Sequence, residues 1–195
     1  MKDFDIKKLK REYCFDVKLR GQELSFCADI GLFSPKKVDV GSRLLIDKME
    51  IGPDDEVLDV GCGYGVLGIA AAKLAVSGRV EMVDKDFVAV DCAKLNIERN
   101  ELSNAQVYLS NMFDQVAEEK QFDVILSNIP AKVTKEMYWL MFHESYQRLK
   151  PGGKIYLVAI TYLRDFLKAN LKRFFGNYKK LAQGKGYVVY RAEKN

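Results

Sequence analysis

The chain has 195 residues, of which 48% are hydrophobic and 30% are charged, and its formal net charge is +4. This composition is that of an ordinary globular protein and fits a single domain over residues 1–195. No apolar run approaches the roughly 18 to 20 residues that a membrane-spanning helix requires, and the charged N-terminus lacks the apolar core of a signal peptide. We therefore expect a cytoplasmic protein without a membrane segment.

The first fifty residues predict a β-hairpin and a short helix ahead of the main fold. Residues 1–11 are polar and partly helical in pattern. Two strand-like runs, 13–19 and 23–27, flank a turn that contains Gly21, which favours a hairpin. A loop over 31–41 then leads into a helix at 42–49. We interpret residues 1–50 as a hairpin and leading segment, and residues 51–195 as the core.

From residue 56 onward, strand and helix patterns alternate. Strands are predicted at about 56–60, 79–84, 105–110, 122–127 and 154–160, and helices at about 65–76, 86–100, 132–149 and 162–174. Residues 178–192 predict an antiparallel hairpin. Such alternation is typical of βαβ units with right-handed crossovers, so the expected fold is α/β with a doubly wound, Rossmann-like, mostly parallel sheet.

The stretch from Glu56 to Gly65 predicts a nucleoside site. An apolar strand carrying Asp59 is followed by three glycines at alternate positions, which free the backbone to turn sharply or lie against a ligand. Asp59 would face a positive group on that ligand. Asp84 ends the next strand, where a carboxylate can accept hydrogen bonds from ribose hydroxyls.

The position of the glycines decides which nucleoside is favoured. Gly63, Gly65 and Gly68 match the dinucleotide fingerprint G-x-G-x-x-G, but this match begins too late for a strand that ends near Val60. The pattern that starts at Asp59 fits the strand end, and it resembles the D-x-G-x-G-x-G motif of class I S-adenosylmethionine-dependent methyltransferases. Nicotinamide binding is the less favoured alternative. A purely structural alternative, in which glycine permits close packing of helix and strand, would explain one glycine but not three at alternate positions.

The resemblance covers roughly residues 13–192. Residues 122–130 are similar to the fourth strand and catalytic loop of these methyltransferases, and residues 149–154 to the turn before their fifth strand. Residues 33–45 resemble the leading segment of the small-domain group, which contains bacterial guanine-N2 methyltransferases of small-subunit ribosomal RNA and single-domain archaeal relatives. The chain has no room for the N-terminal domain that the bacterial enzymes usually carry, so it looks most similar to the single-domain relatives.

The resemblance implies a seven-stranded sheet with an antiparallel C-terminal strand, S-adenosylmethionine as cofactor and S-adenosylhomocysteine as product. It implies that Asp59 lies near the methionine end, that Asp84 holds the ribose and that Lys85 borders the adenosine. Met112 would adjoin the adenine, although core packing explains it equally well. The implied cofactor-binding residues are Phe33, Asp39, Gly41, Asp59, Gly61, Cys62, Gly63, Tyr64, Gly65, Asp84, Lys85, Asn111, Met112 and Asn128.

The catalytic loop departs from the family pattern. Amino-group methyltransferases of this kind commonly carry Asn-Pro-Pro followed by an aromatic residue, in which two carbonyl groups accept the hydrogens of a poorly nucleophilic amine and the aromatic stacks on the base. This chain reads Asn128-Ile129-Pro130-Ala131. We expect Asn128 and Pro130 to be catalytic, while Ala131 lacks the stacking ring. Tyr138, Trp139 and Phe142 are alternative platforms for a base, or else helix-to-sheet core.

Charge distribution and the loop suggest the substrate. Residues 164–195 carry nine Lys/Arg against two acidic residues, a segment that favours phosphate contacts or is simply a solvated surface. We predict methylation of an exocyclic amine of a base in RNA, of the ribosomal kind. The alternatives are a small-molecule or protein N-methyltransferase, which the missing aromatic favours, and a non-catalytic cofactor-binding module.

The cysteines and the histidine predict no metal site. Four cysteines are scattered without Cys-x-x-Cys spacing, a pattern that favours reduced thiols over a zinc site or a disulfide frame. His143, the only histidine, fits a structural position on a helix face. Methyl transfer needs no metal, because the sulfonium is already activated. The four cysteines are Cys14, Cys27, Cys62 and Cys92.

Overall fold

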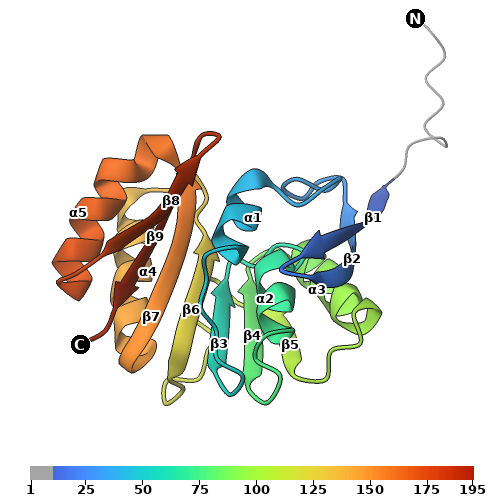
Figure 1. Cartoon of the computed structure of the whole chain (residues 1–195), viewed down its shortest axis with the longest axis horizontal. Helices are drawn as coiled ribbons and strands as arrows, with labels where there is room; N and C mark the ends of the chain where they lie inside the picture. The colour runs from blue at the N-terminus through green and yellow to red at the C-terminus, as the bar shows by residue number, and fades with distance from the viewer. Residues whose placement is uncertain (1–10) are drawn as a thin grey trace, which may run out of the picture.

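A computed structural model describes residues 11–195, so the helical pattern predicted for residues 1–11 lies almost entirely outside the described residues (Figure 1). The main sheet has seven strands in the order β5-β4-β3-β6-β7-β9-β8, and only β9 runs against its neighbours. This confirms the predicted mostly parallel sheet with an antiparallel C-terminal strand. The strands are β3 (Glu56–Val60), β4 (Arg79–Asp84), β5 (Ala105–Leu109), β6 (Phe122–Asn128), β7 (Leu149–Ile160), β8 (Lys179–Gly184) and β9 (Tyr187–Glu193).

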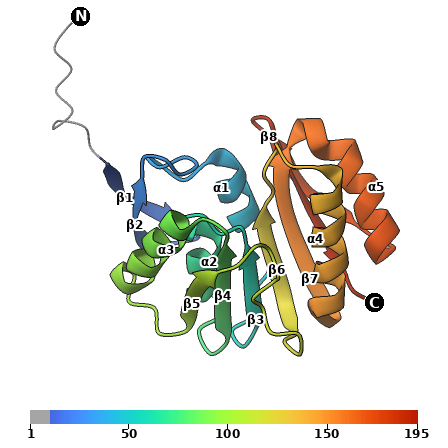
Figure 2. The same cartoon turned by 180° about the vertical axis from the view of Figure 1, so that it is seen from behind.

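Helices cover both faces of this sheet, as Figures 1 and 2 show from opposite sides. One face carries α1 (Val40–Ile46), α2 (Val66–Ala72) and α3 (Phe87–Arg99), and the other carries α4 (Lys135–Arg148) and α5 (Arg164–Phe175). A short 3-10 helix, η2 (Thr161–Leu163), links β7 to α5. The helix predicted at 42–49 begins at Val40 because the Asp39 side chain caps it, accepting the amides of Gly41 and Ser42.

The alternation of side chains along β3 separates the two cores. Val57 packs into the core under α1 to α3, whereas Leu58 and Val60 pack into the core under α4 and α5. By the same two-residue period Asp59 points toward α2, where its Oδ2 accepts the Gly68 amide at 2.8 Å. The strand thus carries a fully buried carboxylate on the α2 face of the sheet.

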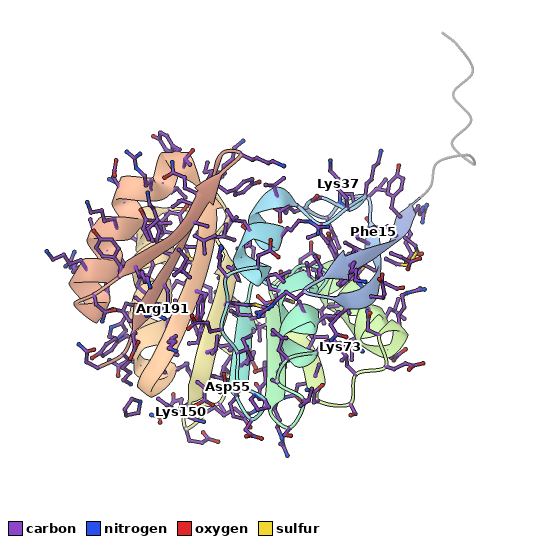
Figure 3. All side chains as sticks on the ribbon, viewed as in Figure 1. Phe15, Lys37, Asp55, Lys73, Lys150 and Arg191 are labelled. Atoms are coloured by element: carbon purple, nitrogen blue, oxygen red, sulfur yellow. A yellow bond between two sulfur atoms is a disulfide. The ribbon has the colours of Figure 1, made fainter. Side chains whose placement is uncertain are left out.

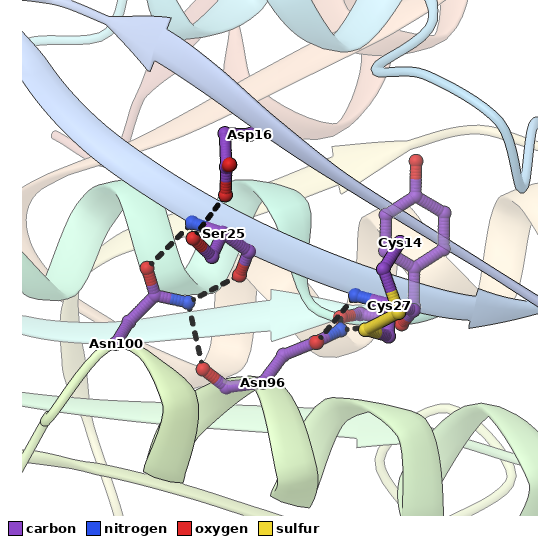
Figure 4. Close-up of a disulfide and its surroundings, with 7 residues drawn as sticks. Cys14, Asp16, Ser25, Cys27, Asn96 and Asn100 are labelled. Carbon is purple, nitrogen blue, oxygen red and sulfur yellow. Dashed lines mark hydrogen bonds between the residues drawn. A yellow bond between two sulfur atoms is a disulfide. The ribbon is translucent and has the colours of Figure 1, made fainter.

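The predicted N-terminal hairpin is a separate two-stranded sheet, β1 (Glu12–Leu19) and β2 (Gln22–Asp29). It is attached to α3 through two asparagines one helical turn apart (Figure 4). Asn96 accepts the Cys27 amide at 2.8 Å and donates to the Cys27 carbonyl at 2.9 Å. Asn100 does the same with Ser25, at 3.0 and 2.7 Å. The two side chains therefore pair with the outer edge of β2 as another strand would.

We expect Asn96→Ala to lower the free energy of unfolding by about 3 kcal/mol, because it leaves several buried backbone groups without hydrogen-bond partners. The second amide hydrogen of Asn96 bonds the Tyr64 carbonyl at 2.9 Å, so the substitution removes partners from both the hairpin and the glycine turn. Urea denaturation followed by circular dichroism measures the change. Asn111→Ala is the matched control: Asn111 is exposed, and we expect its loss to cost less than about 0.5 kcal/mol. Equal loss in both variants would contradict this account.

The expectation of four reduced thiols is wrong, because Cys14 and Cys27 form a disulfide across the hairpin. The two residues are directly opposed in the β1–β2 register, and the backbone groups of Cys27 point to Asn96 rather than to β1. That makes them a non-hydrogen-bonded pair, in which opposed side chains lie closest together. Sequence spacing could not reveal the pairing, which depends on strand register. The carboxylate of Glu12 lies beside both sulfurs, but the disulfide removes them as metal ligands.

A thiol count tests the disulfide directly. With Cys14 and Cys27 bonded, only Cys62 and Cys92 are free, so the unfolded, unreduced protein should titrate two thiols and the reduced protein four. Reduction should also lower stability by about 1–3 kcal/mol, since the bond closes a short loop. Cys14→Ser is the matched variant: it should show the reduced protein's stability whether or not reductant is present. Four thiols without reductant would contradict the assignment.

Candidate active site

A cleft of about 730 Å³ opens at the carboxyl ends of β3, β4 and β6. Strand β3 has β4 as its neighbour on one edge and β6 on the other. The direction in which successive strands are added to the sheet therefore reverses at β3. Open α/β sheets bind ligands at such a switch point. Two segments close over the edge: the β2–α1 loop (residues 30–39), which carries the labelled Lys37 in Figure 3, and residues 129–133 after β6.

The glycine turn forms the floor of this cleft. Gly61, Gly63 and Gly65 have φ angles of +73°, +56° and +94°, a region in which side chains are strained. A Cβ added at Gly61 or Gly63 would meet no atom within 4 Å, so their missing side chains leave open space in the cleft. The amides of Gly61 and Cys62 are bonded to the Val83 carbonyl at 2.9 and 3.0 Å, which fixes the turn against β4.

Cys62 lies in this turn as a small buried residue. Its side chain is 9% exposed, and burial raises the pKa of its thiol well above the usual value. A thiol with a raised pKa is mostly protonated and therefore a poor nucleophile at neutral pH. The small size of the cysteine side chain, rather than the reactivity of its thiol, explains why a cysteine stands at this position.

Asp84 joins the glycine turn to the end of β4. One oxygen accepts the Gly63 amide at 2.8 Å and the other accepts the Asp86 amide at 3.0 Å. The carboxylate is half buried and lines the cleft, with remaining acceptor capacity for ligand hydroxyls. Lys85 follows it as an exposed residue of the same wall.

Asp59 lies under the glycine turn and does not line the cleft. It is fully buried, and its Oδ1 has no hydrogen-bond partner among the described residues. Burial is the main cause that raises the pKa of this carboxyl from 3.8 to about 7, and the charge of Asp84 raises it further while the Gly68 amide opposes the shift. An unpartnered carboxylate this close beneath a cleft favours a positively charged ligand above it.

Asn128 ends β6 at the opposite side of the cleft. Its Nδ2 donates to Asp39 Oδ2 at 3.0 Å and to Ser42 Oγ at 2.9 Å. Asp39 in turn accepts the amides of Gly41 and Ser42 at 2.7 and 3.1 Å. Because both amide hydrogens of Asn128 are used, its Oδ1 is left as an acceptor at the cleft. The α1 N-terminus therefore fixes the orientation of the amide.

The residues after Asn128 hold the loop in place. The Ile129 amide donates to the Val158 carbonyl at 2.8 Å, and the Ile129 side chain is only 4% exposed. The Pro130 carbonyl accepts the Tyr138 hydroxyl at 2.8 Å. Ala131 is exposed and lines the cleft, and its methyl group offers no ring for stacking.

Two of the three alternative base platforms are core residues. Phe142 is fully buried in the core under α4 and α5. Tyr138 lines the cleft but is 4% exposed, with its ring 5.2 Å from that of Phe166. Trp139 is 38% exposed on α4 and is not among the residues that line the cleft. His143 is likewise exposed on α4 and outside the cleft lining.

The far end of the cleft carries the residues expected beside adenine. Met112 is half buried with a φ angle of +55°, and its carbonyl accepts the Ser110 hydroxyl at 2.9 Å. Asn111 is exposed, and its amide donates to Asp114 at 3.1 Å. Both line the cleft, at the carboxyl end of β5 next to Asp84.

Most of the residues singled out in the sequence meet in this cleft, from four different strand ends and the β2–α1 loop. Asp59, Gly41 and Gly65 lie just outside its lining. Packing against Tyr187 explains why residue 41 is a glycine: a Cβ there would lie 2.6 Å from the ring of Tyr187. The lining residues among those predicted are Phe33, Asp39, Gly61, Cys62, Gly63, Tyr64, Asp84, Lys85, Asn111, Met112, Asn128 and Pro130.

Sequence reasoning missed Ser42, Ile160 and Tyr187, which also line the cleft. Tyr187 begins β9 and pairs with Ile160 of β7, which places it two residues beyond the Asn128–Val158 pair. No local pattern distinguishes this tyrosine from the others of the chain. Its position is set by the C-terminal hairpin and by its contact with Gly41.

Comparison with known proteins gives the following similarities. The sequence model of the family described as methyltransferase small domain matches residues 23–191. A protein of Bacillus subtilis described as uncharacterized protein YbxB is 34% identical over 97% of this chain and 94% of its own length. Ribosomal RNA large subunit methyltransferase G of Shewanella amazonensis is 32% identical over 92% of this chain and 48% of its own length.

One solved structure extends the comparison to the whole fold. The 16S rRNA N2 methyltransferase RsmC of T. thermophilus, in complex with AdoMet and guanosine, superposes with a TM-score of 0.86 at 30% identity. The match covers 96% of this chain and 52% of that one. The chain thus spans about half the length of the ribosomal RNA methyltransferases that it matches.

Proposed function

The chain belongs to the methyltransferase small domain family, and from this premise we propose that it transfers a methyl group from S-adenosylmethionine to an exocyclic amine of a base in RNA. The observation that carries the proposal is the orientation of Asn128. Its amide hydrogens are held by Asp39 and Ser42, so its carbonyl oxygen is the group available to an acceptor amine in the cleft.

The residues of the cleft fit S-adenosylmethionine. The glycine turn leaves open space where a ligand would lie against the backbone, and Asp84 would offer a carboxylate to the ribose. Below the cleft lining, the unpartnered oxygen of Asp59 would favour a positively charged methionine end. When bound, S-adenosylmethionine supplies an electrophilic methyl group on its sulfonium. The methyl–sulfur bond would break as the methyl–nitrogen bond forms, which leaves S-adenosylhomocysteine, and the methylated nitrogen would release one proton to water. The proposed reaction requires no metal.

The chain's own contribution is to orient and polarise the acceptor. An exocyclic amine is a poor nucleophile because its lone pair is delocalised into the ring of the base. Hydrogen bonds from the amine to Asn128 Oδ1 and to a loop carbonyl push electron density back to nitrogen. The Pro130 carbonyl already accepts Tyr138, which leaves the Ile129 carbonyl as the second acceptor in this assignment.

RNA contact is proposed for the basic C-terminal quarter and the cleft rim. Seven of its basic side chains are exposed, whereas Arg191 pairs with Glu50 at 3.3 Å and Lys194 is half buried. Lys185, at the tip of the β8–β9 hairpin, lies two residues from the cleft residue Tyr187. We propose the cytoplasm as the compartment, since RNA is there. Among residues 11–195, no helix is long and apolar enough to cross a membrane.

We expect Asp84→Asn to weaken S-adenosylmethionine binding about tenfold, as measured by calorimetric titration. The substitution keeps one oxygen that can accept the Gly63 amide, but the new NH2 group can accept neither the Asp86 amide nor a ribose hydroxyl. S-adenosylhomocysteine shares the ribose and should weaken equally. Asp91→Asn is the matched control, because Asp91 is an exposed α3 residue outside the cleft lining. A folded wild-type protein that binds neither ligand would overturn the cofactor assignment.

A radiolabelled methyl transfer assay then tests the acceptor. We expect label in unmodified ribosomal RNA transcripts and none in a protein or metabolite fraction. Label in protein or metabolites alone would replace RNA by another acceptor. Cofactor binding with no transfer to any fraction would favour the non-catalytic module.

A further inference from the structure

The cleft lacks an aromatic on the catalytic loop but has one on the opposite wall. Among residues 11–195, four aromatic residues line it: Phe33, Tyr64, Tyr138 and Tyr187. Tyr64 and Tyr138 are 5% and 4% exposed, and their hydroxyls bond backbone carbonyls, so neither offers a free ring face. Phe33 and Tyr187 remain as rings that a substrate can reach.

Tyr187 lies beside the carboxylate that holds Asn128: a Cβ on Gly41 would lie 2.6 Å from the Tyr187 ring and 3.0 Å from Asp39 Oδ1. Burial is the larger cause that raises the pKa of the Tyr187 phenol, and the charge of Asp39 adds to it. Asp39 Oδ2 also accepts Asn128 Nδ2 at 3.0 Å. The start of α1 therefore holds the acceptor amide through Asp39 and lies against the ring at Gly41. Phe33 is 66% exposed, and the structure gives it no bond to this network among the described residues.

The backbone beside the Tyr187 ring leaves room for it. Gly41 leaves space for Tyr187, since a Cβ there would lie 2.6 Å from the ring carbon Cδ1. The other side of Tyr187 is open, because the residue is only half buried and lines the cleft. Strand spacing of about 4.8 Å puts β9 two strands, or roughly 10 Å, from β6. The Tyr187 ring and the Asn128 amide both line the cleft, at strand ends separated by β7.

From this arrangement we propose that the C-terminal hairpin supplies a nucleobase subsite: the acceptor base stacks on Tyr187, in place of the aromatic that the loop lacks at Ala131. This inference rests on the proposed function and names the part of the cleft that holds its substrate. Asp39 is the positioning residue of the acceptor amide, and the neighbouring Gly41 gives the base platform its place. Ala131 leaves the loop side free for the base to enter.

Kinetics on an unmodified ribosomal RNA transcript test the subsite. We expect Tyr187→Leu to raise KM for the RNA roughly ten- to hundredfold, the range seen when a stacking aromatic is removed, with cofactor affinity unchanged. Tyr187→Phe keeps the ring and should retain KM within about threefold. Tyr162→Leu is the control, because Tyr162 is 89% exposed nearby but does not line the cleft. A Tyr187→Phe variant as defective as Tyr187→Leu would overturn the stacking role.

A variant that regains RNA affinity tests the subsite without relying only on a loss of affinity. Adding Ala131→Phe to Tyr187→Leu restores an aromatic on the opposite wall, and we expect it to recover most of the lost RNA affinity. If Tyr187→Leu fails to fold by thermal melting, Tyr187→Met replaces it. Unchanged KM in Tyr187→Leu, or a rise only in Phe33→Leu, would overturn the proposal while leaving methyl transfer itself intact. Absence of transfer in the wild type would instead overturn the proposed function.

Discussion

Asn128→Ala is expected to lower the rate of methyl transfer by about a hundred- to a thousandfold at saturating cofactor. The substitution removes the carbonyl that accepts the amine, and the effect falls on the transition state because charge develops on the amine nitrogen only as the new bond forms. Cofactor affinity should stay within about threefold, since the glycine turn and Asp84 are untouched. Single-turnover transfer of radiolabelled methyl, with calorimetric titration of S-adenosylmethionine, measures both quantities.

A matched asparagine separates this role from cofactor binding. Asn111→Ala removes an exposed side chain at the far end of the same cleft. It should weaken cofactor binding and leave the saturated rate unchanged. Asn128→Ala should do the reverse. Full activity in Asn128→Ala would show that the backbone carbonyls alone polarise the amine, and the proposed role of the side chain would be wrong.

Two arguments from sequence pointed to the cleft: a topological rule, and the resemblance to a methyltransferase family. Alternating strand and helix patterns indicated a parallel sheet, and parallel strands bring their carboxyl ends to one edge. Asp84, Asn111 and Asn128 each follow a predicted strand, so their meeting at the edge could be predicted without knowing any side-chain contact.

Contacts between distant segments could not be predicted in this way. Gly41 matched a family motif, but its need for glycine comes from Tyr187, which is 146 residues away in the chain. Cys14 and Cys27 pair only because the hairpin register opposes them. Asn96 lies in the helix predicted at about 86–100, where no pattern singled it out, yet its side chain pairs with a strand edge. In each case tertiary packing decides the role, and local pattern carries no signal of it.

S-adenosylmethionine affinity is expected to fall about tenfold for each pH unit below the pKa of Asp59, which burial raises to about 7. Below that pH the free protein carries a neutral Asp59, whereas a cation above the carboxylate favours the ionised form. Binding must then release a proton, so affinity rises with pH up to about 7 and is constant above it. Calorimetric titration between pH 5 and 8 in buffers of different ionisation enthalpy measures both affinity and proton release.

Raising the pH through the titration of Asp59 has opposite effects on the stability of the free protein and on its affinity for S-adenosylmethionine. Without ligand, the folded protein holds the Asp59 proton between pH 3.8 and about 7 more tightly than the unfolded chain does, so this residue's contribution to stability falls as pH rises through that window. The cofactor reverses the balance by stabilising the ionised carboxylate. S-adenosylhomocysteine lacks the sulfonium charge, so its affinity should depend less on pH. Asp59→Asn should abolish the dependence for both ligands, because the variant has no proton to lose at this position. A pH dependence that survives in Asp59→Asn would assign the titration to another group and remove Asp59 as the partner of the methionine end.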